Sequence, residues 1–198
     1  IGHGATVNSD KPGISSNSIA FGTDAKVKGG NSTAIGWNAD TGDGAGMLAI
    51  GDEASTNNKT AGSATYSANN NQSVALGSRA KAWGDQSVAI GGEVKASGNS
   101  SVAIGGDDID KVRDANGKLY QNITGQAMPS GWLSTESAGD ASVAVGVMAS
   151  SQGHFSTAIG MTSSSSGDGA VAIGPTAKSS GEAGVAIGIQ SQASAKKT

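Results

Sequence analysis

The feature that most constrains this chain is a pentapeptide that recurs along its length at a nearly fixed spacing. Residues 87–91 read Ser-Val-Ala-Ile-Gly, residues 101–105 repeat them, and residues 142–146 differ in one aliphatic side chain. Looser copies end at Gly22, Gly36, Gly51, Gly77, Gly160, Gly174 and Gly188, and most neighbouring copies lie 14 residues apart. A short fixed period indicates a repeat architecture, in which each unit stacks on the next.

Each repeat has the pattern of two short strands joined by tight turns. Residues 93–97 and 101–104 both alternate between small apolar and other side chains, which is the period of a β-strand. Gly98-Asn99 between them is typical of a turn. Because one such unit cannot bury an apolar face alone, the sequence predicts an all-β fold, a parallel β-roll or β-solenoid of 14-residue coils. About ten coils at one strand spacing each would form a rod about 50 Å long.

The alternation also predicts which side chains face inward, and we expect the large aliphatic ones to fill the coil. Val74, Val88, Val102, Val171 and Val185, with Leu76, Ile90, Ile104, Ile173 and Ile187, would then point inward. Small residues would face them from the other strand: Ala25, Ala80, Ala82, Ala96, Ala149 and Ala177.

An alanine stands between the two large residues in every copy, and in this register it would point outward. A flat stripe of methyl groups reads as a packing face, so we expect parallel chains to associate through it as a homotrimer. The trimer-packing residues would be Ala20, Ala34, Ala49, Ala75, Ala89, Ala103, Ala144, Ala158, Ala172 and Ala186.

Composition narrows the classes of function. The net charge of −3 argues against nucleic acid or an anionic membrane as the main partner. There is no Cys, which removes disulfides and thiolate metal sites, and no apolar run is long enough for a membrane helix. The chain starts within a repeat, so we expect it to be a piece of a longer protein.

Two insertions interrupt the repeat within one predicted domain, residues 1–198. They cover about 56–71 and 106–140, and both are expected to be loops, with a turn at Asn116-Gly117. Insertions in solenoids project from one surface and often carry binding. The alternative is that Tyr120 and Trp132 only cap the second loop against the rod.

Catalytic and metal-binding patterns are weak. His3 and His154 are the only histidines, and no nucleophile-elbow motif frames a serine. His154 lies in a turn and is expected to be solvated. The acidic residues 107, 108 and 110 lack the spacing of a calcium loop. We therefore expect no enzyme activity, no metal and no cofactor.

The repeat resembles the YadA-like head repeats of trimeric autotransporter adhesins. Residues 86–91 (Gln-Ser-Val-Ala-Ile-Gly) and 100–105 (Ser-Ser-Val-Ala-Ile-Gly) carry the likeness, which covers nearly the whole chain except the insertions. The resemblance implies a left-handed parallel β-roll, three chains per head, and a stalk anchored in a Gram-negative outer membrane. It also implies virulence-related attachment to collagen, fibronectin, laminin or host-cell receptors. The chain has no recognisable neck, stalk or anchor motif.

The leading interpretation is thus a cell-surface adhesin head, a stiff trimeric rod that presents residues to a large host ligand. The alternative is a structural spacer that holds another binding domain away from the cell. Two other classes are disfavoured. A solenoid enzyme would need longer coils and a catalytic cleft, and an ice-binding protein would need a regular grid of threonines. Aromatic and cationic residues outside the core register are the candidate ligand contacts. They are Trp37, Tyr66, Trp83, Tyr120, Trp132, Lys26, Lys28, Arg79 and Lys81.

Overall fold

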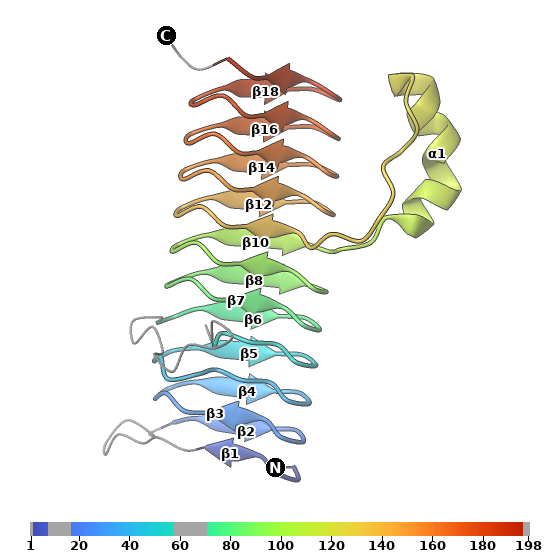
Figure 1. Ribbon diagram of the computed structural model, residues 1–198. Coiled ribbons are helices and arrows are strands. Elements are labelled where there is room, and N and C mark those ends of the chain that lie inside the picture. The colour runs from blue at the N-terminus through green and yellow to red at the C-terminus, as the bar shows by residue number, and fades with distance from the viewer. Residues whose placement is uncertain (1, 8–16, 58–70, 196–198) are drawn as a thin grey trace.

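The chain winds as a rod of stacked parallel coils, with one helix standing beside it (Figure 1). The computed structural model describes residues 2–7, 17–57 and 71–195. In the described residues the named strands pair in parallel, each with the equivalent strand of the next coil. The prediction of an all-β parallel solenoid is confirmed.

Two sheets form the walls of the coils. The first sheet contains the pentapeptides and has ten strands: β2 (Ile19–Phe21), β4 (Thr33–Ile35), β5 (Leu48–Ile50), β6 (Val74–Leu76), β8 (Val88–Gly91), β10 (Val102–Gly105), β12 (Val143–Val145), β14 (Thr157–Ile159), β16 (Val171–Ile173) and β18 (Val185–Ile187). The second has seven: β7 (Lys81–Ala82), β9 (Lys95–Ala96), β11 (Glu136–Ser137), β13 (Ser150–Ser151), β15 (Ser164–Ser165), β17 (Lys178–Ser179) and β19 (Gln192–Ala193). Isolated bridges through Asp40 and Ser55 continue this wall to β3 (Lys26–Val27), which pairs with β1 (Thr6–Val7).

The register of the first sheet is the reverse of the one expected from the sequence. The alanines proposed for trimer packing lie inside the coil: Ala34, Ala49, Ala75, Ala89, Ala103, Ala144, Ala158 and Ala172 are 0% exposed, Ala186 is 3% exposed, and Ala20 is partly buried. The aliphatic residues on either side of them point outward. The prediction of an outward alanine ridge is therefore wrong, and so is that of an inward Val and Ile column.

The physical reason is the thinness of the coil. The second sheet also presents small residues inward, and Ala25, Ala80, Ala82, Ala96, Ala149 and Ala177 are fully buried as predicted. The interior between the walls is narrow and is filled mostly by alanine methyl groups and serine hydroxyls, with a few larger side chains such as Val27 and Val94 on the second wall. The Val, Leu and Ile columns of the first sheet therefore lie outside.

Glycine allows neighbouring coils to stack closely at both turns. Gly91 has φ +126°, and a Cβ there would lie 1.9 Å from the carbonyl oxygen of Gly105. At the opposite turn, a Cβ on Gly84 would lie 1.9 Å from the oxygen of Gly98. Any side chain at either position would collide with the backbone of the next coil, which explains why glycine recurs twice in each repeat.

Buried serines satisfy the turn carbonyls inside the rod. Ser142 Oγ donates to the Gly139 carbonyl oxygen at 2.6 Å and lies 2.6 Å from Ser137 Oγ. The next coil repeats this arrangement with Ser156, whose hydroxyl donates to Gly153 at 2.7 Å and lies 2.6 Å from Ser151 Oγ. Where a serine opens the pentapeptide, as at Ser142 and Ser156, its hydroxyl therefore adds a hydrogen bond to a turn carbonyl that also accepts from the backbone amide of the same serine.

The second insertion is a helix rather than a loop. Helix α1 (Asp110–Thr124) leaves the rod after β10, and Gly125 ends it in the left-handed conformation with φ 69°. The turn predicted at Asn116-Gly117 is wrong, because both residues lie within this helix. The helix is held to the rod by a small apolar cluster of Ile109, Tyr120, Met128 and Met148, with Val147 and Met161 packed against it.

The first insertion is described only at its ends. Thr56 and Asn57 are buried, and the Thr56 hydroxyl donates to the Thr41 carbonyl at 3.0 Å. Residues 58–70 lie outside the described part of the chain, and Tyr66 with them.

Candidate interaction surfaces

The outer face of the first sheet is an apolar ridge that a single chain leaves open to solvent. We call this surface the aliphatic ridge. It consists of two in-register columns on the ten strands, one starting at Ile19 and one at Phe21. Both columns are apolar except for Thr33 and Thr157, and neither contains a charge. The exposed fractions of its members include Ile104 37%, Ile159 38%, Leu76 41%, Val185 60% and Ile187 67%. A contiguous apolar surface of this extent marks a packing face.

The outer face of the second sheet is polar and charged, and it gathers three of the candidate ligand contacts. The ammonium groups of Lys81 and Lys95 lie 5.3 and 5.7 Å from the centre of the Trp83 ring. Lys95 also pairs with Glu136 at 2.7 Å. Arg79 lines a shallow depression on this face together with Lys81 and Lys95. We call this surface the Trp83 patch. It places a half-buried indole within cation–π range of two ammonium groups.

Arg79 is held by carboxylates from the coils on either side. It pairs with Glu93 and, at 3.3 Å, with Glu53. The hydrogen bond and charge of Glu93, followed by those of Glu53, raise the pKa of Arg79 above its ordinary value. The guanidinium therefore stays charged and is oriented by its own chain. Some of its N–H donors are already occupied by these carboxylates.

The helix creates a groove of ≈ 480 Å³ against the rod. One wall is formed by Tyr120, residues 126, 127, 129 and 130, and Leu133, and the other by residues of the coils between Met148 and Gln192. Tyr120 is 7% exposed, and its hydroxyl lies 3.0 Å from Thr176 Oγ1. Of the two explanations for Tyr120, the structure supports capping against the rod, because its ring is buried in that contact.

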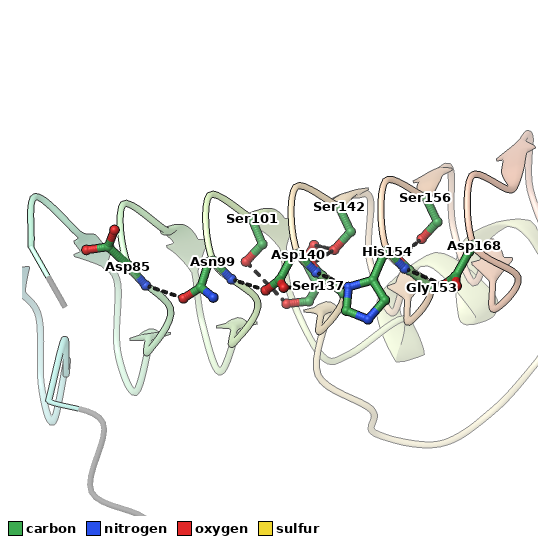
Figure 2. A network of polar contacts seen from close by, with 11 residues as sticks. Asp85, Asn99, Ser101, Ser137, Asp140, Ser142, Gly153, His154, Ser156 and Asp168 are labelled. Atoms are coloured by element: carbon green, nitrogen blue, oxygen red, sulfur yellow. Dashed lines mark hydrogen bonds and ion pairs between the residues drawn. The ribbon is translucent and has the colours of Figure 1, made fainter. Parts of the chain in front are cut away.

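A ladder of polar side chains runs along one turn of the coils (Figure 2). The Asp85 amide donates to Asn99 Oδ1 at 3.1 Å, and the Asn99 amide donates to Asp140 Oδ1 at 2.8 Å. In the next coils the Asp140 amide donates to His154 Nδ1 at 3.1 Å, and the His154 amide donates to Asp168 Oδ1 at 2.9 Å. His154 is exposed, as predicted, and its role is to accept a hydrogen bond within the ladder.

The remaining candidates do not converge. Trp37 is 52% exposed at a turn near the start of the rod, and Trp132 is 70% exposed beyond the helix. Lys26 Nζ donates to Asn38 Oδ1 at 3.3 Å, and Lys28 lies 3.9 Å from Asp43. These four residues therefore do not share a site with the Trp83 patch. Sequence reasoning missed Lys95 and Glu136 of that patch; the 14-residue offset from Lys81 to Lys95 was the available signal.

Within residues 2–7, 17–57 and 71–195, no group of three or more His, Cys, Asp or Glu is placed to hold a metal ion. Over the same part of the chain, no helix has the length and apolarity to cross a membrane.

Parallel coils of 14 residues, an alanine-filled interior and an outward aliphatic ridge define a β-roll repeat domain. A family model described as the YadA head domain repeat matches residues 15–39, 68–93, 95–107, 137–163, 165–191 and 179–197. The chain belongs to this family. A search of curated proteins found no match. The family is one of trimeric autotransporter adhesins that bind host proteins and are displayed from the outer membrane, and it is non-enzymatic in kind.

Proposed function

We propose that the chain is the head of a homotrimeric surface adhesin that attaches a Gram-negative bacterium to its host. The partners would be extracellular-matrix proteins such as collagen, fibronectin or laminin, or host-cell receptors. The observation that carries this proposal is the aliphatic ridge, because it gives the family's trimeric assembly a physical basis in this chain. A rigid trimer would then display three copies of every outward surface.

The ridge supports the homotrimer because identical chains can cover one another's ridge without any other partner. Both columns run parallel to the rod, so three chains standing in register around an axis would bury the ridge along its full length. Such symmetric closure leaves no apolar face free for further growth. The alanine stripe cannot serve this purpose, since its methyl groups are already covered within one chain.

The Trp83 patch is the surface proposed to meet the host protein. Aromatic and cationic side chains dominate binding energy in protein interfaces, and this patch holds an indole with two lysines around it. It lies on the opposite wall of the coil from the ridge, so trimer formation through the ridge leaves it outward. Three copies on one rigid head would strengthen weak contacts through avidity.

One observation favours the spacer instead. Arg79 pairs with Glu53 and Glu93, and Lys95 pairs with Glu136. Charges that are paired within their own chain can serve to keep a surface solvated, and need not bind a ligand. A head whose outer face does only this would act as a rigid extension for another binding domain.

Solid-phase binding of the trimer to a panel of matrix proteins and to host cells tests the two functions. The double variant Lys81→Ala/Trp83→Ala should lose most of the binding while remaining trimeric, and Trp37→Ala is the matched control at an exposed indole elsewhere. Absence of binding by the unaltered trimer across the panel would favour the spacer. Equal binding by the double variant and the control would exclude the Trp83 patch.

A further inference from the structure

We propose that the groove between α1 and the rod is a binding site for a carboxylated oligosaccharide. This site is separate from the Trp83 patch and does not depend on the host-protein proposal. Its volume of ≈ 480 Å³ lies within the range of small-ligand sites. The insertion is required for it, because the wall opposite the coils comes entirely from the insertion, with Tyr120 as the contribution of α1.

The charge of the groove selects for an anion. Lys178 on β17 is the only charged side chain among its lining residues in the described chain, and no carboxylate lines it. Its ammonium group has no hydrogen-bond or ion-pair partner among the described residues, in contrast to Lys95, which pairs with Glu136. In an acidic chain, an unpaired cation in a groove free of carboxylates provides a site that attracts a negative ligand.

The floor of the groove presents polar groups at regular intervals. Ser164, Lys178 and Gln192 are in register on consecutive coils, so their side chains are spaced by about 4.8 Å, one strand spacing. None of the three side chains makes a hydrogen bond to another described residue. A hydroxyl, an ammonium and an amide in a row can donate to a carboxylate and exchange hydrogen bonds with the hydroxyls of adjacent sugar rings.

The shape and the opposite wall favour a saccharide over an acidic peptide. A peptide gains affinity by pairing its backbone with a free strand edge, but β15 and β17 are each paired on both sides by neighbouring coils. The insertion wall supplies Ala127, Pro129 and Leu133 as a low apolar surface. The C–H face of a sugar ring can pack on such a surface while its hydroxyls meet the floor.

Binding is measured on the intact trimer by calorimetry and by saturation-transfer NMR, with sialyllactose as the probe. Lactose is the uncharged comparison, and a peptide of matched acidity tests the competing class of ligand. We expect sialyllactose to bind, lactose to bind at least tenfold more weakly, and the peptide not to compete. A second carboxylated probe, a glucuronate-containing disaccharide, distinguishes a general carboxylate site from one that requires sialic acid.

Two variants locate the site. Lys178→Gln removes the charge and should weaken sialyllactose binding about tenfold or more, since a hydrogen bond to a charged group is lost. Ser164→Trp fills the groove with the lysine retained and should abolish binding. Lys111→Gln, at an exposed lysine of α1 outside the groove, is the control and should leave affinity within about twofold of wild type, as expected for screened surface charges.

The proposal is overturned if neither carboxylated saccharide binds the trimer. It is also overturned if Lys178→Gln and Ser164→Trp bind as the Lys111→Gln control does, or if lactose or the acidic peptide matches sialyllactose. Because the readout is saccharide affinity, loss of host-protein binding in the Trp83 patch variant would not affect this result.

Discussion

The aliphatic ridge makes a quantitative prediction about assembly. Ile104 and Ile159 lie on the ridge and remain 37% and 38% exposed in a single chain. Full burial of such a side chain is worth about 1.5–3 kcal/mol, so covering the remaining third or so contributes about 0.6–1.1 kcal/mol per residue. Two residues in each of three chains then account for about 3–7 kcal/mol of trimer stability.

The perturbation is the double variant Ile104→Ser/Ile159→Ser. Since each 1.4 kcal/mol corresponds to a factor of ten, its trimer association constant should fall by about two to five orders of magnitude. The matched control is Val112→Ser/Ile123→Ser, which removes two side chains of α1 that are 42% and 61% exposed but lie off the ridge. That control should assemble as the wild type does.

Sedimentation velocity across nanomolar to micromolar protein, with circular dichroism to confirm the β-fold, measures the effect. A wild-type chain that stays monomeric at micromolar concentration would refute the ridge as an assembly face. So would a ridge variant that dissociates no more readily than the α1 control.

Three further predictions concern the coil and the helix. Ala103→Val should destabilise the fold by about 1–3 kcal/mol, measured by chemical denaturation, because it overfills a position that is 0% exposed. Gly91→Ala should lower the melting temperature sharply and cost at least about 2 kcal/mol of stability, because φ is +126° and a Cβ there meets the backbone of the next coil. Gly92→Ala is the control and should be nearly neutral, because a Cβ there has nothing within 4 Å. Tyr120→Phe removes the hydrogen bond to Thr176 and should weaken the docking of α1 on the rod by about 1 kcal/mol. Hydrogen exchange should then be faster than in the wild type for α1, with little change for the coils.

The repeat could be predicted from the sequence because its signal is redundant. The pentapeptide, the glycines and the turn residues all recur with one period, so an error at one copy is corrected by the others. The number of sheets, their parallel pairing and the position of both insertions follow from that period. The positions of the serines and glycines are explained only by the structure, which shows the carbonyl groups that they meet.

The orientation of the first sheet could not be read from the period, because alternation by two is unchanged when inside and outside are exchanged. The general preference of large aliphatic residues for the interior favoured the wrong register at Val102 and Ala103. The distance between the two walls decides which residues of the first sheet face inward, and the second sheet sets that distance. Its inward residues are mostly small, such as Ala82 and Ala96, and that pattern was a usable signal for a thin coil.

Helix α1 was missed because its interior carries Asn116 and Gly117, which are typical of turns. The segment does contain boundary signals. Asp108 accepts a hydrogen bond from the Asp110 amide at 2.6 Å, and Gly125 ends the helix in the left-handed conformation. Packing of Tyr120 against the rod then outweighs the weak propensity of the central residues, as tertiary contacts commonly do.

The inverted register ties the fold to the function that we propose. A coil filled mainly by methyl groups has little room for larger side chains, so the bulky aliphatic residues of the first sheet and the charged residues of the second stand on the outer faces. One face is then almost entirely apolar and favours association, while the other can vary in charge and shape without disturbing the interior. Substitution of Ser150 or Lys178 on that second face would leave the coil intact, whereas Ala103 permits no such change. A scaffold of this kind separates assembly from recognition, and that separation allows an insertion such as α1 to add a binding groove to a rod whose core stays the same.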